Sequence, residues 1–245
     1  MQPVLLGLRY AFAGFNLIGR PGIRQYVLVP LAINMVLFAA AIVWGMGSVG
    51  DFIRWLSRQW EWLEWIAWLL WPLFVVIALI LIFFSFSIIA NLLGSPFNGF
   101  LAAAVERTLA GTGPALRGEA GGFIGEMRAA VSSESRKFLY FAARALPLSL
   151  LFAIPLINIA AAPVWFLFGA WMLALEYLEY PLGNRGLLFP EVRAQVSGNR
   201  RLALGFGIGV LCLTLIPVLN FLAMPVAVAG GTKLVVERFP AAAPS

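Results

Sequence analysis

One repeated pattern limits how this chain can fold more than any other feature. The motif Ile-Pro-X-X-Asn occurs at residues 154–158 and, 62 residues later, at 216–220, and each copy is followed five residues later by Pro-Val. Both copies lie in the middle of 31 uncharged residues, 145–175 and 202–232. A straight helix of that length would measure about 46 Å, whereas the hydrocarbon core of a bilayer is ~30 Å thick. The pattern therefore predicts that each segment bends back on itself.

The prolines indicate where the bend occurs. Two prolines eight residues apart remove helical amide donors and clash with the preceding turn. The remaining arms, of about ten to twelve residues, are too short to span a bilayer. This favours two re-entrant helical hairpins, with Asn158 and Asn220 capping the broken helices; two kinked spanning helices are the alternative. Backbone groups freed at membrane depth must be buried in protein or line a wet cavity, so paired hairpins indicate a path for a polar solute.

Composition sets the class of protein. Of 245 residues, 62% are hydrophobic and 11% are charged, and the mean hydropathy is +0.91, which is typical of a multi-pass membrane protein. The net charge of +6 is spread over loops and helix ends, which favours anchoring at the membrane interface over nucleic-acid binding.

The residue types that are absent exclude most catalytic chemistry. The chain has no histidine, and Asp51 is its single aspartate. These counts exclude a Ser-His protease, a His-ligated metal site and a paired-aspartate protease. Neither lysine follows a glycine in a phosphate-loop pattern, so no nucleotide site is predicted. We therefore predict a protein that is not an enzyme and that needs no metal or cofactor.

The order of apolar and charged segments predicts an all-α integral membrane protein with one membrane domain. Lysine and arginine are enriched on one side of the predicted spans, which favours a cytoplasmic N-terminus. The predicted parts are an amphipathic interfacial helix (1–20), two long transmembrane helices (25–50 and 65–92), a cytoplasmic helical segment (100–144) and two half-penetrating hairpins (145–175 and 202–232).

The strongest candidate binding site precedes the first spanning segment. The sequence there is Arg20-Pro21-Gly22-Ile23-Arg24-Gln25. A helix start offers unpaired amides and the positive end of the helix dipole, glycine lets an oxyanion approach the backbone, and arginine adds a fork of donors. The residue pattern predicts a site for a tetrahedral dianion. The alternative is that these arginines extend to lipid headgroups.

Polar residues within apolar surroundings are candidates for a conduction path. Glu176 and Glu179 lie one helical turn apart and are expected to pair with cytoplasmic arginines, with proton coupling as a second hypothesis. The candidates for lining a pore are Asn34, Asn91, Ser95, Asn98, Glu106 and Arg107.

Several blocks of this sequence resemble the CysZ family of bacterial sulfate permeases, from about residue 5 to residue 235. The resemblance implies sulfate uptake across the inner membrane for cysteine biosynthesis, a fold of two spanning helices with half-penetrating hairpins, and homo-oligomeric assembly. The blocks that carry it are Gly22-Ile23-Arg24, 27–31 with Asn34, 95–102, 163–168, 170–174, 216–220 and 224–228.

The same resemblance implies a sulfate site at a Gly-hydrophobic-Arg-Arg turn, which falls on Gly22, Ile23 and Arg24. Gln25 replaces the second arginine of the family pattern. Glutamine can donate a hydrogen bond but carries no charge, so either weaker anion binding or help from Arg20 is expected.

Two classes of function stay open at this point. One is a channel-like sulfate permease or a coupled carrier, for which sulfite and related oxyanions are alternative substrates. The other is a membrane-shaping or scaffold hairpin protein without transport activity, whose partner is the lipid bilayer.

Overall fold

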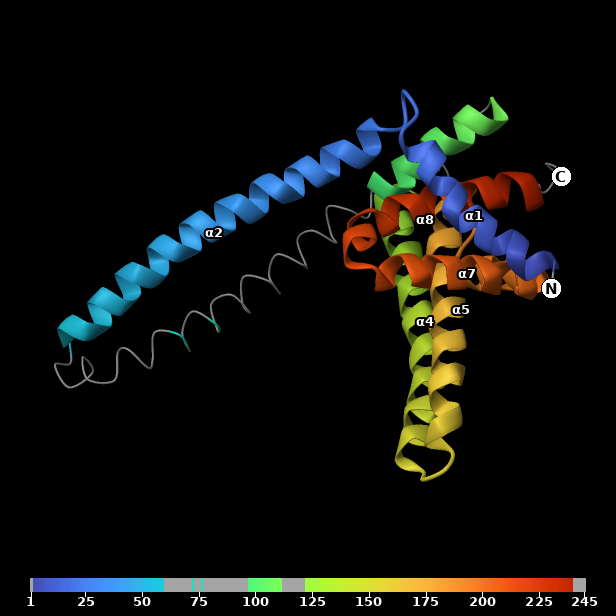
Figure 1. Cartoon of the computed structure of the whole chain (residues 1–245). Helices are drawn as coiled ribbons and strands as arrows, with labels where there is room; N and C mark the ends of the chain where they lie inside the picture. Colours follow the sequence, from blue (N-terminus) through green and yellow to red (C-terminus); the bar gives the residue numbers. More distant parts are fainter. Residues whose placement is uncertain (1, 60–71, 73–75, 77–96, 112–121, 240–245) are drawn as a thin grey trace. The chain divides into compact units, whose positions relative to one another are not determined.

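A computed structural model describes residues 2–59, 72, 76, 97–111 and 122–239 (Figure 1). All regular structure in these ranges is helical, which confirms the all-α prediction. In chain order the helices are α1 (Gln2–Ile18), α2 (Gln25–Gln59), a helix over residues 97–110, α4 (Gly122–Leu150), α5 (Asn158–Asn184), α6 (Phe189–Gly198), α7 (Arg200–Leu215) and α8 (Pro217–Arg238).

The chain divides into two compact units. One consists of Met1–Arg24 and Asn98–Ser245, and the other of Gln25–Phe97. By length and composition, three helices in the described ranges could cross a membrane: Gln25–Trp44, Asn158–Asn184 and Leu219–Arg238. These apolar helices agree with the prediction of a membrane protein.

The unit Gln25–Phe97 is described chiefly by α2. This helix continues for 35 residues and contains Pro30. It is longer than the predicted span 25–50 and continues through 51–59. Pro30 is the sixth residue of this helix and removes one backbone hydrogen bond, to the Tyr26 carbonyl oxygen, without ending the helix. The predicted span 65–92 lies outside the described residues except at 72 and 76.

The core of the larger unit is built where α1 crosses α7 and α8 (Figure 1). The buried face of α1 includes three small residues, Gly7, Ala11 and Gly14, beside Tyr10 and Leu17. A Cβ atom at Gly14 would overlap the Val226 carbonyl oxygen, and one at Gly205 would overlap the Val4 carbonyl oxygen. The helices therefore meet backbone to backbone, as small residues permit in membrane proteins.

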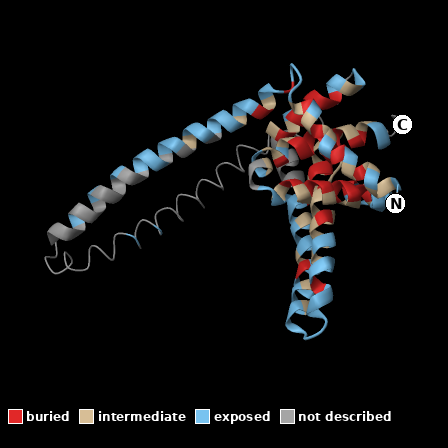
Figure 2. Ribbon diagram, viewed as in Figure 1, coloured by how far each residue is buried: buried red, intermediate tan, exposed pale blue. Residues whose placement is uncertain are grey.

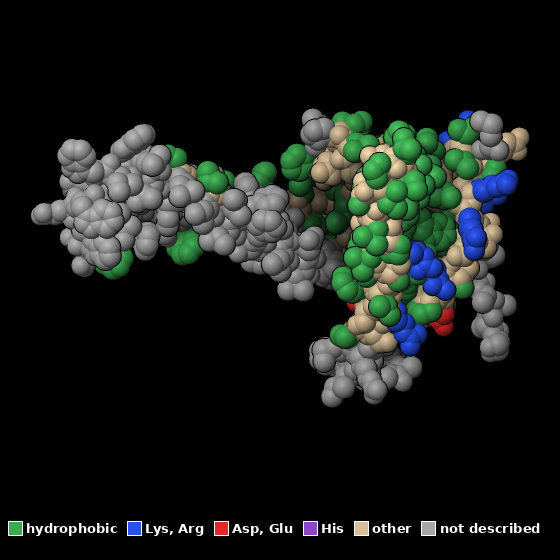
Figure 3. Space-filling model, turned by 90° about the horizontal axis from the view of Figure 1, so that it is seen from below, with side chains coloured by type: hydrophobic (Ala, Val, Ile, Leu, Met, Phe, Trp, Pro, Cys, Tyr) green, Lys and Arg blue, Asp and Glu red, His purple; other side chains and the backbone are tan. Residues whose placement is uncertain are grey.

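Burial is concentrated in this crossing. Figure 2 shows buried residues along α1, α7, α8 and the adjoining end of α5, whereas the free end of the α4–α5 pair is exposed. Figure 3 shows hydrophobic side chains over that free end. The exposed large apolar residues there include Leu146, Leu150, Phe152, Ile154, Leu156, Ile157 and Ile159.

Both repeats of the proline motif form helical hairpins. α4 ends in a short 3-10 turn, Leu151–Ala153, and α5 begins after the turn at 154–157. Leu156 at this turn has φ = 71° and is 85% exposed. In the second repeat, the chain breaks at Ile216, whose φ and ψ of −96° and 112° are extended, and Pro217 opens α8. Proline in a first helical turn is favoured because its missing amide would be unpaired there.

Two details of the predicted hairpins are wrong. Pro163 and Pro225 lie inside α5 and α8, so the helices break at the first proline of each pair only, and α5 runs for 27 residues rather than about ten to twelve. The caps are also different. Ile157 and Ile216 occupy the N-cap positions without a side-chain hydrogen bond, and Asn158 and Asn220 lie inside the helices.

In its described residues, 100–111 and 122–144, the predicted cytoplasmic segment contains parts of two helices. The helix over 97–110 ends at Gly111, whose φ is 73°, and α4 continues without interruption from residue 122 into the hairpin. After α5, the short helix α6 begins at Phe189, and the Glu191 carboxylate accepts a hydrogen bond from the Leu188 amide at 2.7 Å. This capping contact satisfies one of the otherwise unpaired amides at the helix start.

Candidate functional site

The turn after α1 carries the predicted anion-binding residues. The Arg20 carbonyl oxygen accepts hydrogen bonds from the amides of Ile23 and Arg24, both at 3.1 Å. Gly22 has φ = 85°, a conformation that favours glycine. The Ile23 side chain is fully buried, which fixes the turn on the protein.

The polar side chains of this turn are accessible. Arg20 and Arg24 are exposed on either side of the buried Ile23, and Gln25, the first residue of α2, is exposed as well. Because the amides of Ile23 and Arg24 already donate to Arg20, the guanidinium groups are the stronger donors that remain for an anion.

The helix over 97–110 contains three of the predicted pore residues. Asn98 is buried, and its side-chain nitrogen lies 3.3 Å from the Tyr180 hydroxyl oxygen and 3.2 Å from Sδ of Met224. Arg107, in contrast, is exposed, and its Nε donates to the Ala103 carbonyl oxygen in its own helix. Asn98 thus links this helix to α5 and α8, whereas Arg107 faces the surface.

Glu106 forms a buried ion pair that the sequence did not predict. Nε and Nη2 of Arg185 lie 3.0 and 2.8 Å from Glu106 Oε1, and Nη1 of Arg185 donates to the Phe239 carbonyl oxygen at 2.7 Å. The second carboxylate oxygen, Oε2, is buried and has no hydrogen-bond partner in the described residues. A carboxylate with one unsatisfied buried oxygen is costly, so Arg185 is required to hold it.

The expectation that Glu176 and Glu179 pair with arginines is wrong. Their partner is Lys137 on α4, whose Nζ lies 3.1 Å from Glu176 Oε2 and 2.9 Å from Glu179 Oε2. Glu134 completes the cluster at 3.0 Å. Burial alone would lower the pKa of Lys137, but the charges of Glu176 and Glu179 outweigh it and raise the pKa above its ordinary value of 10.5. This cluster joins α4 to α5 at the end of the pair that lies away from the hairpin turn.

The remaining pore candidates have no described side-chain geometry. Asn91 and Ser95 lie outside the described residues, and the Asn34 side chain does as well. Among the described residues, no hydrogen bond or ion pair joins Asn98 or Glu106 to the arginines of the 19–24 turn.

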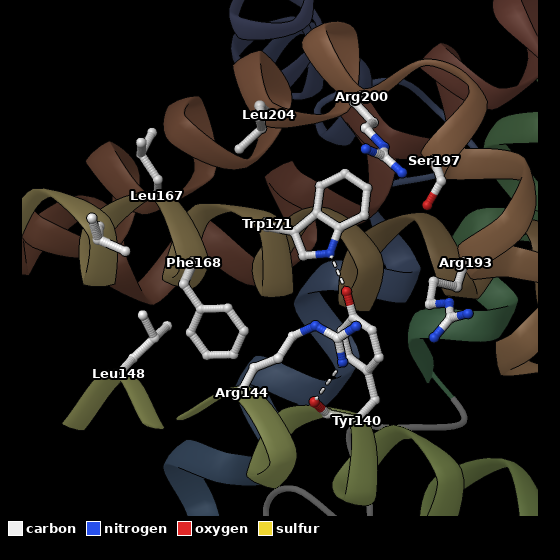
Figure 4. A pocket seen from close by; sticks show the side chains of 11 residues that line it. Tyr140, Arg144, Leu148, Leu167, Phe168, Trp171, Arg193, Ser197, Arg200 and Leu204 are labelled. Atoms are coloured by element: carbon white, nitrogen blue, oxygen red, sulfur yellow. Dashed lines mark hydrogen bonds between the residues drawn. The ribbon is translucent and has the colours of Figure 1, made fainter. Parts of the chain in front are cut away.

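A pocket that the sequence analysis missed lies between α4, α5, α6 and α7 (Figure 4). Its volume is about 580 Å³. At its centre, Trp171 Nε1 donates to the Tyr140 hydroxyl oxygen at 2.9 Å, and the guanidinium carbon of Arg144 lies 3.7 Å from the centre of the Tyr140 ring. The lining residues are Tyr140, Arg144, Leu148, Val164, Leu167, Phe168, Trp171, Arg193, Ser197, Arg200 and Leu204.

A regular spacing could have revealed this pocket in the sequence. All four helices contribute residues four apart. They are Tyr140, Arg144 and Leu148 from α4, Val164 with Phe168 and Leu167 with Trp171 from α5, Arg193 and Ser197 from α6, and Arg200 and Leu204 from α7. Residues four apart share one face of a helix. The spacing alone could not show that the faces of four helices meet, because that depends on contacts between distant segments.

Comparison with known proteins supports a family assignment. The family model described as "Sulfate transporter CysZ/Etoposide-induced protein 2.4" matches residues 10–225. Proteins named "Sulfate transporter CysZ" from two Pseudomonas fluorescens strains, Pf0-1 and Pf-5, are 42% and 44% identical; each alignment covers 94% of this chain, with 92% and 93% of the relatives covered. A protein of that name from Pectobacterium atrosepticum is 40% identical over 95% of this chain and 85% of the relative. These relatives are named as transporters, which agrees with the prediction that the chain is not an enzyme.

Proposed function

Because this chain belongs to the family of sulfate transporter CysZ and etoposide-induced protein 2.4, we propose that it takes up sulfate across the bacterial inner membrane and supplies sulfur for cysteine biosynthesis. The observation that carries this proposal is the similarity to sulfate transporters over 94% of the chain, which includes the Gly22-Ile23-Arg24 turn. Sulfite and related oxyanions share the charge and shape of sulfate closely enough to be tested as competitors.

We place the sulfate site at Arg20, Gly22, Ile23, Arg24 and Gln25. A dianion needs charge-assisted donors, and Arg20 and Arg24 are exposed on one short turn held by the buried Ile23. Gln25 adds a neutral donor. Since Gln25 stands where the family pattern has a second arginine, this site binds sulfate more weakly than a site with both arginines.

The proposed membrane placement follows from where charge begins on the α4–α5 hairpin. Residues 145–150 are helical and 151–153 form a 3-10 turn, so Arg144 lies about 15 Å from the tip, roughly half of the ~30 Å slab. The exposed tip residues Leu146, Leu150 and Leu156 would then lie in lipid. The α4–α5 hairpin thus enters from one side without crossing, whereas α2 is long and apolar enough to span the membrane.

The conduction path in this proposal is assembled from several copies of the chain and is channel-like. A half-penetrating hairpin leaves half of the bilayer uncrossed, and backbone groups freed at that depth must be buried in protein or line a wet cavity, which several copies together can provide. Candidates for lining the path are Asn34, Asn91, Ser95, Asn98, Glu106 and Arg107. Of these, Asn98 and Glu106 are buried in the single chain. In this conformation they hold the helices next to the path in place and do not contact sulfate.

Sulfate binding and uptake test the proposal. Purified protein is titrated with sulfate, with phosphate and chloride as competitors, and reconstituted in vesicles for uptake of labelled sulfate. We expect saturable binding that Arg24→Gln weakens at least tenfold and that Gln25→Arg strengthens, since a charge-assisted hydrogen bond is worth about 1.5–3 kcal/mol. Arg9→Gln, which removes an exposed arginine of α1 outside this turn, serves as the control.

The exposed apolar tip, with Leu156 85% exposed, also suits a second function, a membrane-shaping or scaffold protein. In that case well-folded wild-type protein would show neither saturable sulfate binding nor sulfate uptake, and Arg24→Gln would alter only its attachment to lipid.

A further inference from the structure

The Arg144, Arg193 and Arg200 pocket combines a cationic end with an apolar wall. Arg193 and Arg200 lie at the α6–α7 corner, and Arg144 lies over one side of the Tyr140 ring (Figure 4). The guanidinium carbon of Arg193 lies 5.1 Å from the centre of the same ring. The Tyr140 ring thus holds two guanidinium groups by cation–π attraction. Nη1 of Arg144 donates to the Tyr140 carbonyl oxygen at 3.3 Å, and the other N–H donors of the two groups remain for an anion.

No acidic side chain neutralises these arginines among the described lining residues. None of the described ion pairs includes Arg144, Arg193 or Arg200. The carboxylates of the surrounding helices are engaged elsewhere: Glu176 and Glu179 with Lys137, and Glu191 with the Leu188 amide. A smaller adjoining pocket of about 330 Å³ shares Tyr140, Arg144 and Arg193 and adds Arg136, so the positive region extends along α4.

The opposite end of the pocket is apolar. Leu148 and Val164 lie toward the hairpin tip, one turn beyond Arg144 on α4 and about two turns beyond Trp171 on α5. One helical turn is about 5.4 Å, so charge changes to hydrocarbon over little more than that distance. Leu167 and Val164 are exposed although they are apolar, as expected for side chains that contact acyl chains.

We propose that this pocket binds an anionic phospholipid. Its phosphodiester would be held by Arg144, Arg193 and Arg200, and its acyl chains would lie along Leu148, Val164 and Leu167. The aromatic pair Tyr140 and Trp171 marks the depth of the headgroups, where tyrosine and tryptophan are enriched in membrane proteins. A free oxyanion would use only the arginines and leave the apolar wall without a function. The inference rests on the membrane placement proposed for the hairpin, but not on the sulfate site.

Lipid binding to the purified full-length protein in neutral detergent tests this proposal. The probes are dioleoyl phosphatidylglycerol, dioleoyl phosphatidylcholine and, as headgroup-sized anions, glycerol 3-phosphate and inorganic sulfate. We expect phosphatidylglycerol to bind at least tenfold more tightly than the other three. Arg193→Gln and Arg200→Gln should each weaken it about tenfold to a hundredfold, because each removes a charge-assisted hydrogen bond. Arg201→Gln, an exposed neighbour outside the pocket, should change it less than twofold.

A second variant tests the apolar wall separately. Leu167 is 48% exposed, so Leu167→Asn should fold normally and still weaken phosphatidylglycerol binding. The proposal is overturned if glycerol 3-phosphate or sulfate binds the pocket as tightly as the lipid, if the two phospholipids bind equally, or if Arg201→Gln is as harmful as Arg200→Gln. Sulfate binding by the same samples distinguishes the two proposals. If the protein binds sulfate but does not prefer phosphatidylglycerol, only this inference is refuted. If it prefers phosphatidylglycerol but does not bind sulfate, only the proposed function is refuted.

Discussion

Two nitrogens of Arg185, Nε and Nη2, donate to a single oxygen of Glu106, at 3.0 and 2.8 Å. Only 8% of the Glu106 side chain is exposed, and 16% of the Arg185 side chain. The third contact of Arg185, with the Phe239 carbonyl oxygen, ties the end of α8 to the same group. One guanidinium therefore connects the helix over 97–110, the end of α5 and the end of α8.

Removing Arg185 should destabilise the protein strongly. Arg185→Leu would leave a buried carboxylate without its counter-ion, which typically costs about 3–5 kcal/mol. The double variant Glu106→Leu with Arg185→Leu should recover much of this loss, because no buried charge remains. Thermal unfolding of the purified variants measures both effects. Equal melting temperatures for Arg185→Leu and the wild type would contradict the assignment of Arg185 as the counter-ion of Glu106.

Lys137 should contribute far more to stability than the other lysine, Lys233. Lys137→Met leaves three carboxylates in mutual repulsion, and we expect a loss of about 2 kcal/mol. Lys233 makes only a partly exposed pair with Glu237 at 3.8 Å, and such pairs contribute about 0.5 kcal/mol or less. Lys233→Met is therefore the matched control, and unfolding midpoints at pH 7 compare the two.

The Lys137 contribution should also depend on pH in a defined direction. The carboxylates raise the pKa of folded Lys137 above its ordinary value of 10.5. Stability from this group is therefore fully present below that pH and falls as the pH rises through the raised pKa. The difference in unfolding midpoint between wild type and Lys137→Met should stay constant from about pH 7 to pH 10 and shrink above that range. A difference that shrinks between pH 7 and pH 9 would contradict the assignment.

The backbone crossing of α1 and α7 should not tolerate a single methyl group. Gly205→Ala would drive its Cβ into the Val4 carbonyl oxygen, so the helices must separate, at an expected cost of about 2 kcal/mol or more. Gly169→Ala in α5 is the control, because nothing lies within 4 Å of the position that its added methyl group would occupy. That change should stabilise the helix by about 0.5–1 kcal/mol. The two melting temperatures should therefore move in opposite directions.

Gly22 should matter through its backbone alone. An added Cβ would meet no atom within 4 Å, but φ = 85° strains any residue with a side chain. We expect Gly22→Ala to cost about 1 kcal/mol and to weaken sulfate binding by displacing Arg24. Gly19→Ala lies in the same turn, is equally free of contacts and does not have a positive φ. If both variants bind sulfate equally well, the conformation of Gly22 does not organise the site.

Local sequence chemistry predicted the elements of this fold better than their partners. The prolines at 155 and 217 located both hairpin turns, because a missing amide acts within one turn of the helix. Pro163 was misjudged, since neighbouring helices can compensate an internal proline. Lys137 as the partner of Glu176, and Arg185 as that of Glu106, could not be predicted, because each pair joins segments far apart in sequence.

In the candidate sites too, features set by neighbouring residues could be predicted, whereas contacts between distant segments could not. Gly22 and its flanking arginines were recognisable because the turn chemistry is contained in six consecutive residues. The arginines at 144, 193 and 200 were visible only as a contribution to net charge, since their meeting depends on the packing of α4, α6 and α7. The glycine contacts that pack α7 against α1 and α5 are equally hidden, because glycine has no side chain by which a sequence pattern could reveal its partner.

The pairing of α1 with α7 and α8 has a consequence during synthesis. Gly14 packs on Val226, which lies 212 residues later in the chain. At about 5–20 residues per second, the ribosome needs roughly 10–40 s to supply this partner. Throughout that interval α1 must wait beside the membrane with its glycine face uncovered, so a segment made long before its partners is among the last to reach its final place.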